Sequence, residues 1–159
     1  MRFYFYRGKG IWAALIRWFT RSKYAHMAVV FEDGTVYESV PGKGVIKGTL
    51  KSTEGVTPFC YKMGARPNSE AARKFCESEL GTGYDYWGCI CFLIGIRQRR
   101  SASRYFCSEF GADAAKVAEV ALQERVESPV LSPDICAMSP VIMVDYARRF
   151  QWDHVGRYS

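Results

Sequence analysis

The sequence predicts an α+β domain in which an antiparallel sheet, formed early in the chain, packs against helices that follow it. Short runs rich in β-branched and aromatic residues, separated by glycine-containing turns, fill residues 1–62. Apolar residues at helical spacing dominate the part of the chain that follows. With 159 residues, 48% of them hydrophobic, the chain is long enough for one core, so we expect a single domain over residues 1–159.

The expected strands cover residues 3–6, 26–32, 35–40, 44–49 and 55–62. Asp33-Gly34 lies between two of these runs and is a strong signal for a β-hairpin. A two-residue turn would put the side chain of Ser39 on the same sheet face as His26. A three-residue loop, Glu32-Asp33-Gly34 with left-handed Gly34, would instead put Glu38 on that face. We predict the three-residue loop.

We expect four helices: one at residues 11–19, one capped by Asn68 or Ser69 and ended by Gly81, one at residues 87–96 and one at residues 107–123. A late strand is expected at residues 141–146. The first helix has Trp12, Leu15, Ile16 and Phe19 at helical spacing, with Arg17 on the other side. The last helix is the clearest, because Phe110, Ala114, Val117, Ala118, Ala121 and Leu122 form one apolar stripe.

Composition favours a cytoplasmic protein. The first six residues alternate and are followed at once by basic residues, unlike a signal peptide, and no apolar segment approaches the roughly 20 residues of a transmembrane helix. The six cysteines lie mostly in apolar runs, as reduced core thiols do. No Cys-x-x-Cys is present and there are only two histidines, so we expect no metal and no other cofactor.

The formal net charge of +6 favours anionic partners, and much of the basic charge falls in residues 97–104. The basic residues of this stretch are Arg97, Arg99, Arg100 and Arg104. The simpler interpretation is a solvated loop; the alternative is a rim that contacts an anionic surface. We expect no specific recognition of nucleic acid, because no recognised motif is present.

Cys107 stands at the start of the clearest helix. A helix N-terminus and a neighbouring imidazolium both stabilise a thiolate, which is the nucleophilic form of cysteine. The backbone amides of the same helix start could donate to an oxyanion. The alternative is that Cys107 is one more small apolar residue at a helix end, like the other five cysteines.

A histidine base would have to be His26 or His154. His26 lies at the mouth of an apolar strand, whereas His154 lies in a polar tail near the end of the chain, so His26 is better placed. The simpler interpretation is a histidine hydrogen-bonded at a sheet edge. With the three-residue loop, Glu38 would be a diagonal neighbour of His26, close enough to orient its ring.

Several short motifs, taken in order, resemble one family. They are Tyr-Ala-His before a hydrophobic run, Val-Tyr-Glu-Ser after a turn, Tyr-Asp-Tyr at 84–86, Tyr-Phe-Cys-Ser-Glu around Cys107, and Leu-Ser-Pro-Asp-Ile at 131–135. This order is similar to the circularly permuted branch of the NlpC-like, papain-fold cysteine hydrolases, often called YiiX-like. The likeness extends from about residue 11 to residue 146.

The resemblance implies a permuted papain-like fold in which the histidine strand precedes the cysteine helix. It implies Cys107 as nucleophile, His26 as base and Glu38 as third residue, acting on amide or ester bonds in peptide, amide or lipid-type acyl substrates. It also points to Tyr146 as a functional tyrosine, and we add Tyr24, beside the histidine motif, as an oxyanion or substrate-binding candidate. Two alternatives stay open: an acyltransferase using the same residues, and a non-catalytic binding or assembly module.

Overall fold

The chain forms a six-stranded antiparallel sheet with helices on one face and at one end. The computed structural model describes residues 1–21, 23–49, 59–62, 68–93, 103–123 and 153–157. The strand order is β4-β3-β2-β1-β5-β8. The strands are β1 (Arg2–Tyr6), β2 (His26–Val30), β3 (Thr35–Val40), β4 (Gly44–Thr49), β5 (Phe59–Lys62) and β8 (Asp153–Arg157). The α+β class with an antiparallel sheet is therefore confirmed.

The hairpin between β2 and β3 has the predicted three-residue loop. Val29 pairs with Tyr37, and Val30 pairs with Val36. The Phe31 amide donates to the Thr35 carbonyl over 2.9 Å, which closes a loop of residues 32–34. Gly34 has a φ of 81°, the left-handed conformation that this loop needs and that glycine adopts without a steric penalty. The register predicted from Asp33-Gly34 is confirmed.

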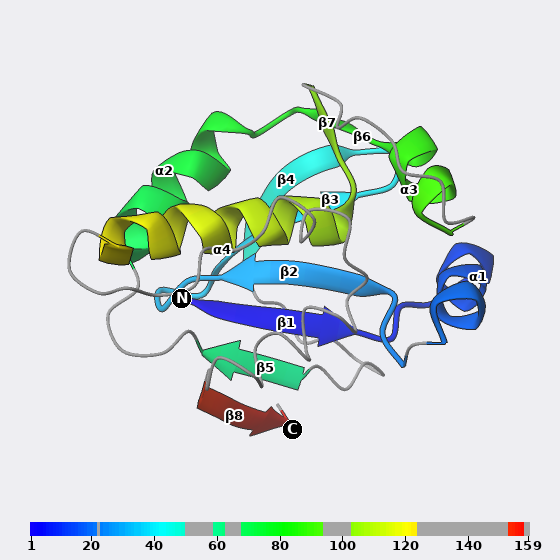
Figure 1. The fold of residues 1–159 in the computed structure, drawn as a ribbon, viewed down its shortest axis with the longest axis horizontal. Coiled ribbons are helices and arrows are strands. Elements are labelled where there is room, and N and C mark those ends of the chain that lie inside the picture. The colour runs from blue at the N-terminus through cyan, green and yellow to red at the C-terminus, as the bar shows by residue number, and fades with distance from the viewer. Residues whose placement is uncertain (22, 50–58, 63–67, 94–102, 124–152, 158–159) are drawn as a thin grey trace.

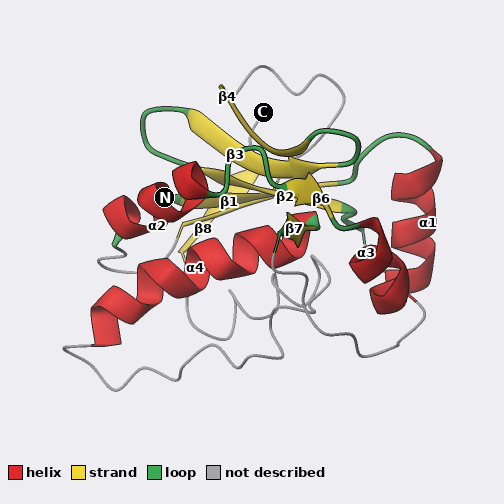
Figure 2. Cartoon of the chain, turned by 90° about the horizontal axis from the view of Figure 1, so that it is seen from above, coloured by secondary structure: helices red, strands yellow, loops and turns green. Residues whose placement is uncertain are grey.

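Two helices cover one face of the sheet. They are α2 (Ser69–Ser78) and α4 (Cys107–Gln123), which contact each other, while α4 also contacts β2 and β3. Both lie on the same side of the sheet in Figures 1 and 2. The predicted cap of α2 is confirmed, because the Asn68 side chain accepts a hydrogen bond of 2.9 Å from the Ala71 amide. At the far end of the sheet, α1 (Ile11–Thr20) and α3 (Tyr86–Leu93) lie side by side.

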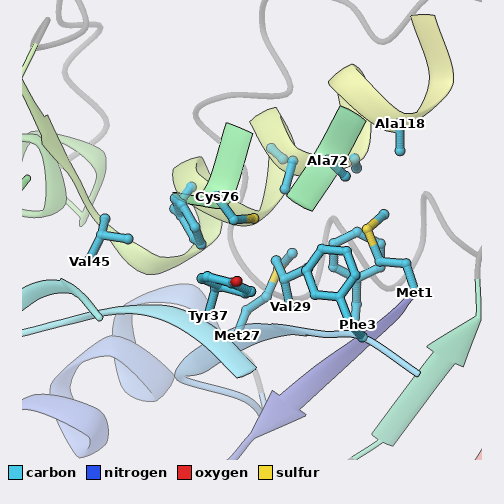
Figure 3. Close-up of a cluster of buried hydrophobic side chains, with 14 of the residues drawn as sticks. Met1, Phe3, Met27, Val29, Tyr37, Val45, Ala72, Cys76 and Ala118 are labelled. Carbon is cyan, nitrogen blue, oxygen red and sulfur yellow. The ribbon is translucent and has the colours of Figure 1, made fainter. Parts of the chain in front are cut away.

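The main hydrophobic core lies between the sheet and the helices α2 and α4 (Figure 3). Strands β1 to β4 contribute Phe3, Phe5, Met27, Val29, Tyr37 and Val45; α2 contributes Ala72 and Cys76; α4 contributes Phe110, Ala114, Ala115 and Ala118. Small residues along α4 allow the helix to lie close to the sheet. The predicted apolar stripe of α4 is confirmed at 110, 114 and 118, all of which are buried.

Polar contacts fix α2 over the edge of the sheet. Glu77 of α2 accepts hydrogen bonds from the Tyr37 hydroxyl (2.5 Å) and the Lys47 ammonium (2.7 Å), which come from β3 and β4. Arg73 forms a 3.0 Å ion pair with Asp33 in the hairpin loop and lies over the ring of Phe31. The hairpin that carries His26 and Glu38 is therefore tied to the helical layer.

Three features differ from the sequence-based expectations. The predicted polar tail around His154 is strand β8, because its backbone finds a partner in β5. A short parallel pair, β6 (Gly83–Tyr84) with β7 (Arg104–Tyr105), forms a second sheet. Finally, α1 forms as predicted, but most of its apolar side chains are exposed. The predicted strand at 141–146, including Tyr146, and residues 55–58 lie outside the described residues.

Candidate active site

His26 and Glu38 meet where β2 begins. His26 is the first residue of β2, and Glu38 lies on β3 as its diagonal neighbour. Their side chains are joined by a hydrogen bond of 2.7 Å between His26 Nε2 and Glu38 Oε2. Both are partly exposed, His26 by 21% and Glu38 by 29%. The Tyr6 ring flanks the imidazole, with ring centroids 5.8 Å apart. Because both side chains are partly exposed at the end of the sheet where β2 begins, a ligand can reach them.

Cys107 is the first residue of α4, as the apolar stripe predicted. It is 5% exposed, and its thiol lies 3.9 Å from the carbonyl oxygen of Ala25, the residue before His26. The first amides of a helix have no acceptor within that helix, so the start of α4 presents a positive backbone potential to the sulfur. Cys107 and His26 are 81 positions apart in the chain. The packing of α4 on β2 thus brings Cys107 to the end of β2 at which His26 lies.

The charges around His26 favour its protonated form. Burial alone would lower the pKa of His26, because it penalises the charged imidazolium. The negative charge and hydrogen bonding of Cys107, followed by the hydrogen bond and charge of Glu38, outweigh burial and raise the pKa to about 10. His26 thus interacts with both the candidate nucleophile and the candidate orienting acid. The three predicted residues come together in space.

A buried tyrosine and a second thiol lie close to Cys107. Burial raises the pKa of Tyr84, and the negative charge of Cys107 adds to the effect. Burial also raises the pKa of Cys89 to about 11, again with a contribution from Cys107. In α2, burial raises the pKa of Cys76 to about 12. Cys76 and Cys89 therefore stay neutral at physiological pH, which leaves them poor nucleophiles.

Two buried polar residues, Ser39 and Asp85, position the segment before Cys107, a role that the sequence did not indicate. The hydroxyl of Ser39 donates to the Tyr105 carbonyl over 2.7 Å, and the backbone amide of Asp85 donates to the same oxygen over 3.1 Å. The Ser39 hydroxyl therefore donates its hydrogen bond to Tyr105 and not to His26. The Asp85 carboxylate also caps α3 by accepting from the Gly88 amide over 2.8 Å. A local signal existed for the capping role of Asp85, which precedes an apolar helical run; none indicated that Ser39 would contact Tyr105.

Comparison with known proteins adds no family assignment. No protein-family model matches this chain, and no curated protein matches it. The arguments about the site therefore rest on its geometry and on the motifs in the sequence.

The remaining predicted site residues have different outcomes. Tyr24 is buried in the main hydrophobic cluster, with its ring 6.2 Å from that of Phe5. Arg104 is exposed on β7. The predicted residues Tyr146, Arg97, Arg99 and Arg100 lie outside the described residues. Within the part of the chain that the structure describes, no three His, Cys, Asp or Glu side chains are grouped to hold a metal ion, and no helix is long and apolar enough to cross a bilayer.

Proposed function

We propose that the chain is a cysteine hydrolase of amide or ester bonds that works through a Cys107–His26–Glu38 triad. The observation that carries the proposal is geometric: His26 Nε2 is hydrogen-bonded to Glu38 over 2.7 Å, and the thiol of Cys107, which begins a helix, lies 3.9 Å from the carbonyl oxygen of Ala25, the residue before His26. A histidine held between an acid and a thiol is the arrangement that activates cysteine nucleophiles on several unrelated folds. If His26 had only a structural role, its hydrogen bond to Glu38 would be sufficient, and a cysteine at the start of the neighbouring helix would have no function there.

The reaction divides into two acyl-transfer steps. In the first, the Cys107 thiolate attacks the substrate carbonyl carbon, a thioester forms, and the bond to the nitrogen or oxygen leaving group breaks. The leaving group takes its proton from the His26 imidazolium. In the second, His26 accepts a proton from water as the water oxygen attacks the thioester. The carbon–sulfur bond then breaks, which returns the Cys107 thiolate and the His26 imidazolium.

Glu38 acts on the imidazole and not on the substrate. Its hydrogen bond to Nε2 leaves Nδ1 as the ring nitrogen that exchanges protons at the sulfur side, and its negative charge stabilises the imidazolium. In this mechanism the backbone amides at the start of α4 stabilise the oxyanion of the tetrahedral intermediate. Both roles depend on the packing of α4 against the β2–β3 hairpin.

We assign the fold to the circularly permuted papain-like class. Two features support this assignment: the cysteine helix packs across an antiparallel sheet, and the histidine strand precedes that helix in the chain. The motif-level resemblance to the NlpC-like, YiiX-like hydrolases implies the same order. The proposed substrates are peptide, amide or lipid-type acyl compounds.

The test is turnover of a panel of small neutral esters and amides, with intact-mass detection of an acyl-enzyme adduct. Cys107→Ala and His26→Ala should each reduce turnover by about a hundredfold or more. Glu38→Gln should lose less, because an orienting group makes and breaks no bond in the reaction. Cys89→Ala removes a neighbouring thiol and should retain activity. Full activity of the Cys107 and His26 variants would overturn the proposal in favour of a non-catalytic binding module.

A further inference from the structure

The apolar face of α1 points away from the molecule. Since successive residues in an α-helix are rotated by about 100°, the five large apolar residues Ile11, Trp12, Leu15, Trp18 and Phe19 share an arc of roughly 120°. All five are exposed, Trp18 by 72%. A helix at the surface of a water-soluble domain usually turns such an arc inward, so the exposed arc requires an explanation.

The inward side of α1 is the polar and small side. Ala13 is buried, and a side chain at Gly8 would lie 2.9 Å from Ala13 Cβ, so the helix is in close contact with the loop before it. Arg17, on the same side, donates hydrogen bonds to the carbonyl oxygens of Arg7 and Gly8. These contacts fix the orientation of α1. Because Arg17 is held on the inner side of the helix, the apolar arc on the opposite side faces away from the molecule.

The second helix at this end also exposes large apolar side chains. Tyr86, Trp87 and Ile90 share one side of α3 and are exposed. Because α1 and α3 contact each other and lie side by side in Figures 1 and 2, the two arcs belong to one end of the molecule. We call these eight apolar residues the α1–α3 face. Three exposed tryptophans at one end of a molecule are uncommon on a protein surface with no partner.

The segment of the chain that carries α1 contains basic side chains and no acidic ones. Residues 1–31 contain six Lys or Arg residues and no Asp or Glu. Four of the six are exposed in the loops at the two ends of α1: Arg7, Lys9, Arg21 and Lys23. Tryptophan and tyrosine are enriched where proteins meet the headgroup region of a bilayer, and flanking basic residues bind anionic headgroups.

We propose that the α1–α3 face docks on an anionic lipid surface. The exposed aromatic and aliphatic side chains insert at the boundary between headgroups and acyl chains, and the basic residues beside α1 bind phosphate-bearing headgroups. The proposal concerns binding and does not depend on the chemistry of Cys107. It does place the candidate site near the lipid, because the loop that holds α1 also approaches Ala25, whose carbonyl contacts the Cys107 thiol.

The experiment is flotation of the full chain with vesicles of phosphatidylcholine alone or of phosphatidylcholine and phosphatidylglycerol in equal parts, combined with tryptophan emission. We expect binding and a blue shift with the anionic vesicles and weaker binding to the neutral ones. Leu15→Ser and Trp18→Ser should each reduce the partition coefficient by about tenfold or more, as expected for loss of a buried apolar side chain. Lys23→Glu should also weaken binding, and added salt should weaken it further.

The matched controls lie on α2 and just after it. Leu80 is 39% exposed and Leu15 is 38% exposed, so Leu80→Ser removes the same apolar group from another surface. Lys74 is an exposed lysine of α2, so Lys74→Glu matches Lys23→Glu in charge. Both controls should bind like the unchanged chain. Failure to bind anionic vesicles, or equal losses in test and control variants, would overturn the proposal. A dimer in sedimentation velocity that Trp18→Ser dissociates would also overturn it, in favour of a second copy.

Discussion

His26 lies between two groups that both favour its charged form, and this has a consequence for stability as well as for chemistry. Its pKa is raised from 6.5 to about 10 despite burial, because Cys107 and Glu38 supply negative charge and hydrogen bonds. The folded chain therefore holds a proton on His26 over a range of pH in which the unfolded chain has lost it. Such a group stabilises the fold at low pH, and the stabilisation fades as pH rises.

The first prediction concerns that pH range. Relative to His26→Gln, the unchanged chain should have its largest stability advantage below pH 6.5, and this advantage should decrease as pH rises to about 10. Urea unfolding of the two proteins across this range measures the difference in free energy of unfolding. A constant difference across the range would mean that His26 titrates alike in both states. NMR titration of the imidazole should also find a lower pKa for His26 in Cys107→Ala, because two of the raising interactions are removed.

The second prediction concerns the thiols. Cys107 lies beside an imidazolium at a helix start, whereas burial raises the pKa of Cys89 to about 11 and of Cys76 to about 12. Limiting iodoacetamide at mildly acidic pH should therefore label Cys107 first, with the adduct located by peptide mapping. His26→Ala should slow that labelling. Preferential labelling of Cys60, Cys76, Cys89, Cys91 or Cys136 would contradict the assignment of Cys107 as nucleophile.

Among the elements, the β2–β3 hairpin decides which side chain reaches His26. Its three-residue loop puts Glu38 against the imidazole and leaves Ser39 facing Tyr105. A loop shorter by one residue would exchange these two side chains between the faces of the sheet. The left-handed conformation of Gly34, with a φ of 81°, is what permits the longer loop.

The third prediction compares two glycines that differ in backbone conformation. A side chain at Gly34 or at Gly48 would meet no atom within 4 Å, but only Gly34 is left-handed. Gly34→Ala should therefore cost about 1 kcal/mol through backbone strain alone, whereas Gly48→Ala should be close to neutral. Chemical denaturation of both variants measures the two changes. Equal changes in stability for Gly34→Ala and Gly48→Ala would show that the hairpin register does not depend on the left-handed conformation of residue 34.

The elements also show which parts of the fold can be predicted from the sequence. The hairpin and α4 were predictable because their signals are local: Asp33-Gly34 between apolar runs, and a long stripe of apolar residues after Cys107. The orientation of α1 was not predictable, since periodicity shows that a helix has an apolar side but not which way that side faces. Strand β8 depends on pairing with β5, a segment about a hundred residues earlier, and its own sequence is polar.

The same distinction applies to the site. The register argument could bring Glu38 to His26, because both lie on one hairpin. The hydrogen bond from Ser39 to the Tyr105 carbonyl joins residues 66 positions apart and follows only from the docking of β7 against the sheet. That Cys107 meets His26 was implied by the resemblance and by the helix start, and it is the packing of α4 on the sheet that brings them together.

For the molecule as a whole, the site depends on how closely α4 approaches β2. Gly111 lies one turn into α4, and a side chain there would lie 2.0 Å from Met27 Cε and 3.0 Å from Met27 Sδ. Met27 is fully buried and is the residue next to His26. Glycine at 111 and methionine at 27 therefore pack closely against each other, between the helix that carries Cys107 and the strand that carries His26.

The last prediction tests this fit by a double-mutant cycle. Gly111→Ala gains about 1 kcal/mol of helix propensity but crowds a packed core, at a cost of about 1–3 kcal/mol. Met27→Ala alone leaves a cavity and should cost about 2–5 kcal/mol. If the two side chains share one space, the double variant should be less destabilised than the sum, by about 1 kcal/mol or more, when measured by urea unfolding. Iodoacetamide labelling of Cys107 should slow in Gly111→Ala and recover in the double variant, because removing the Met27 side chain lets α4 return toward β2. Additive losses of stability, together with unchanged labelling, would mean that the helix can shift without disturbing Cys107 and His26, and that contacts other than this one position the nucleophile.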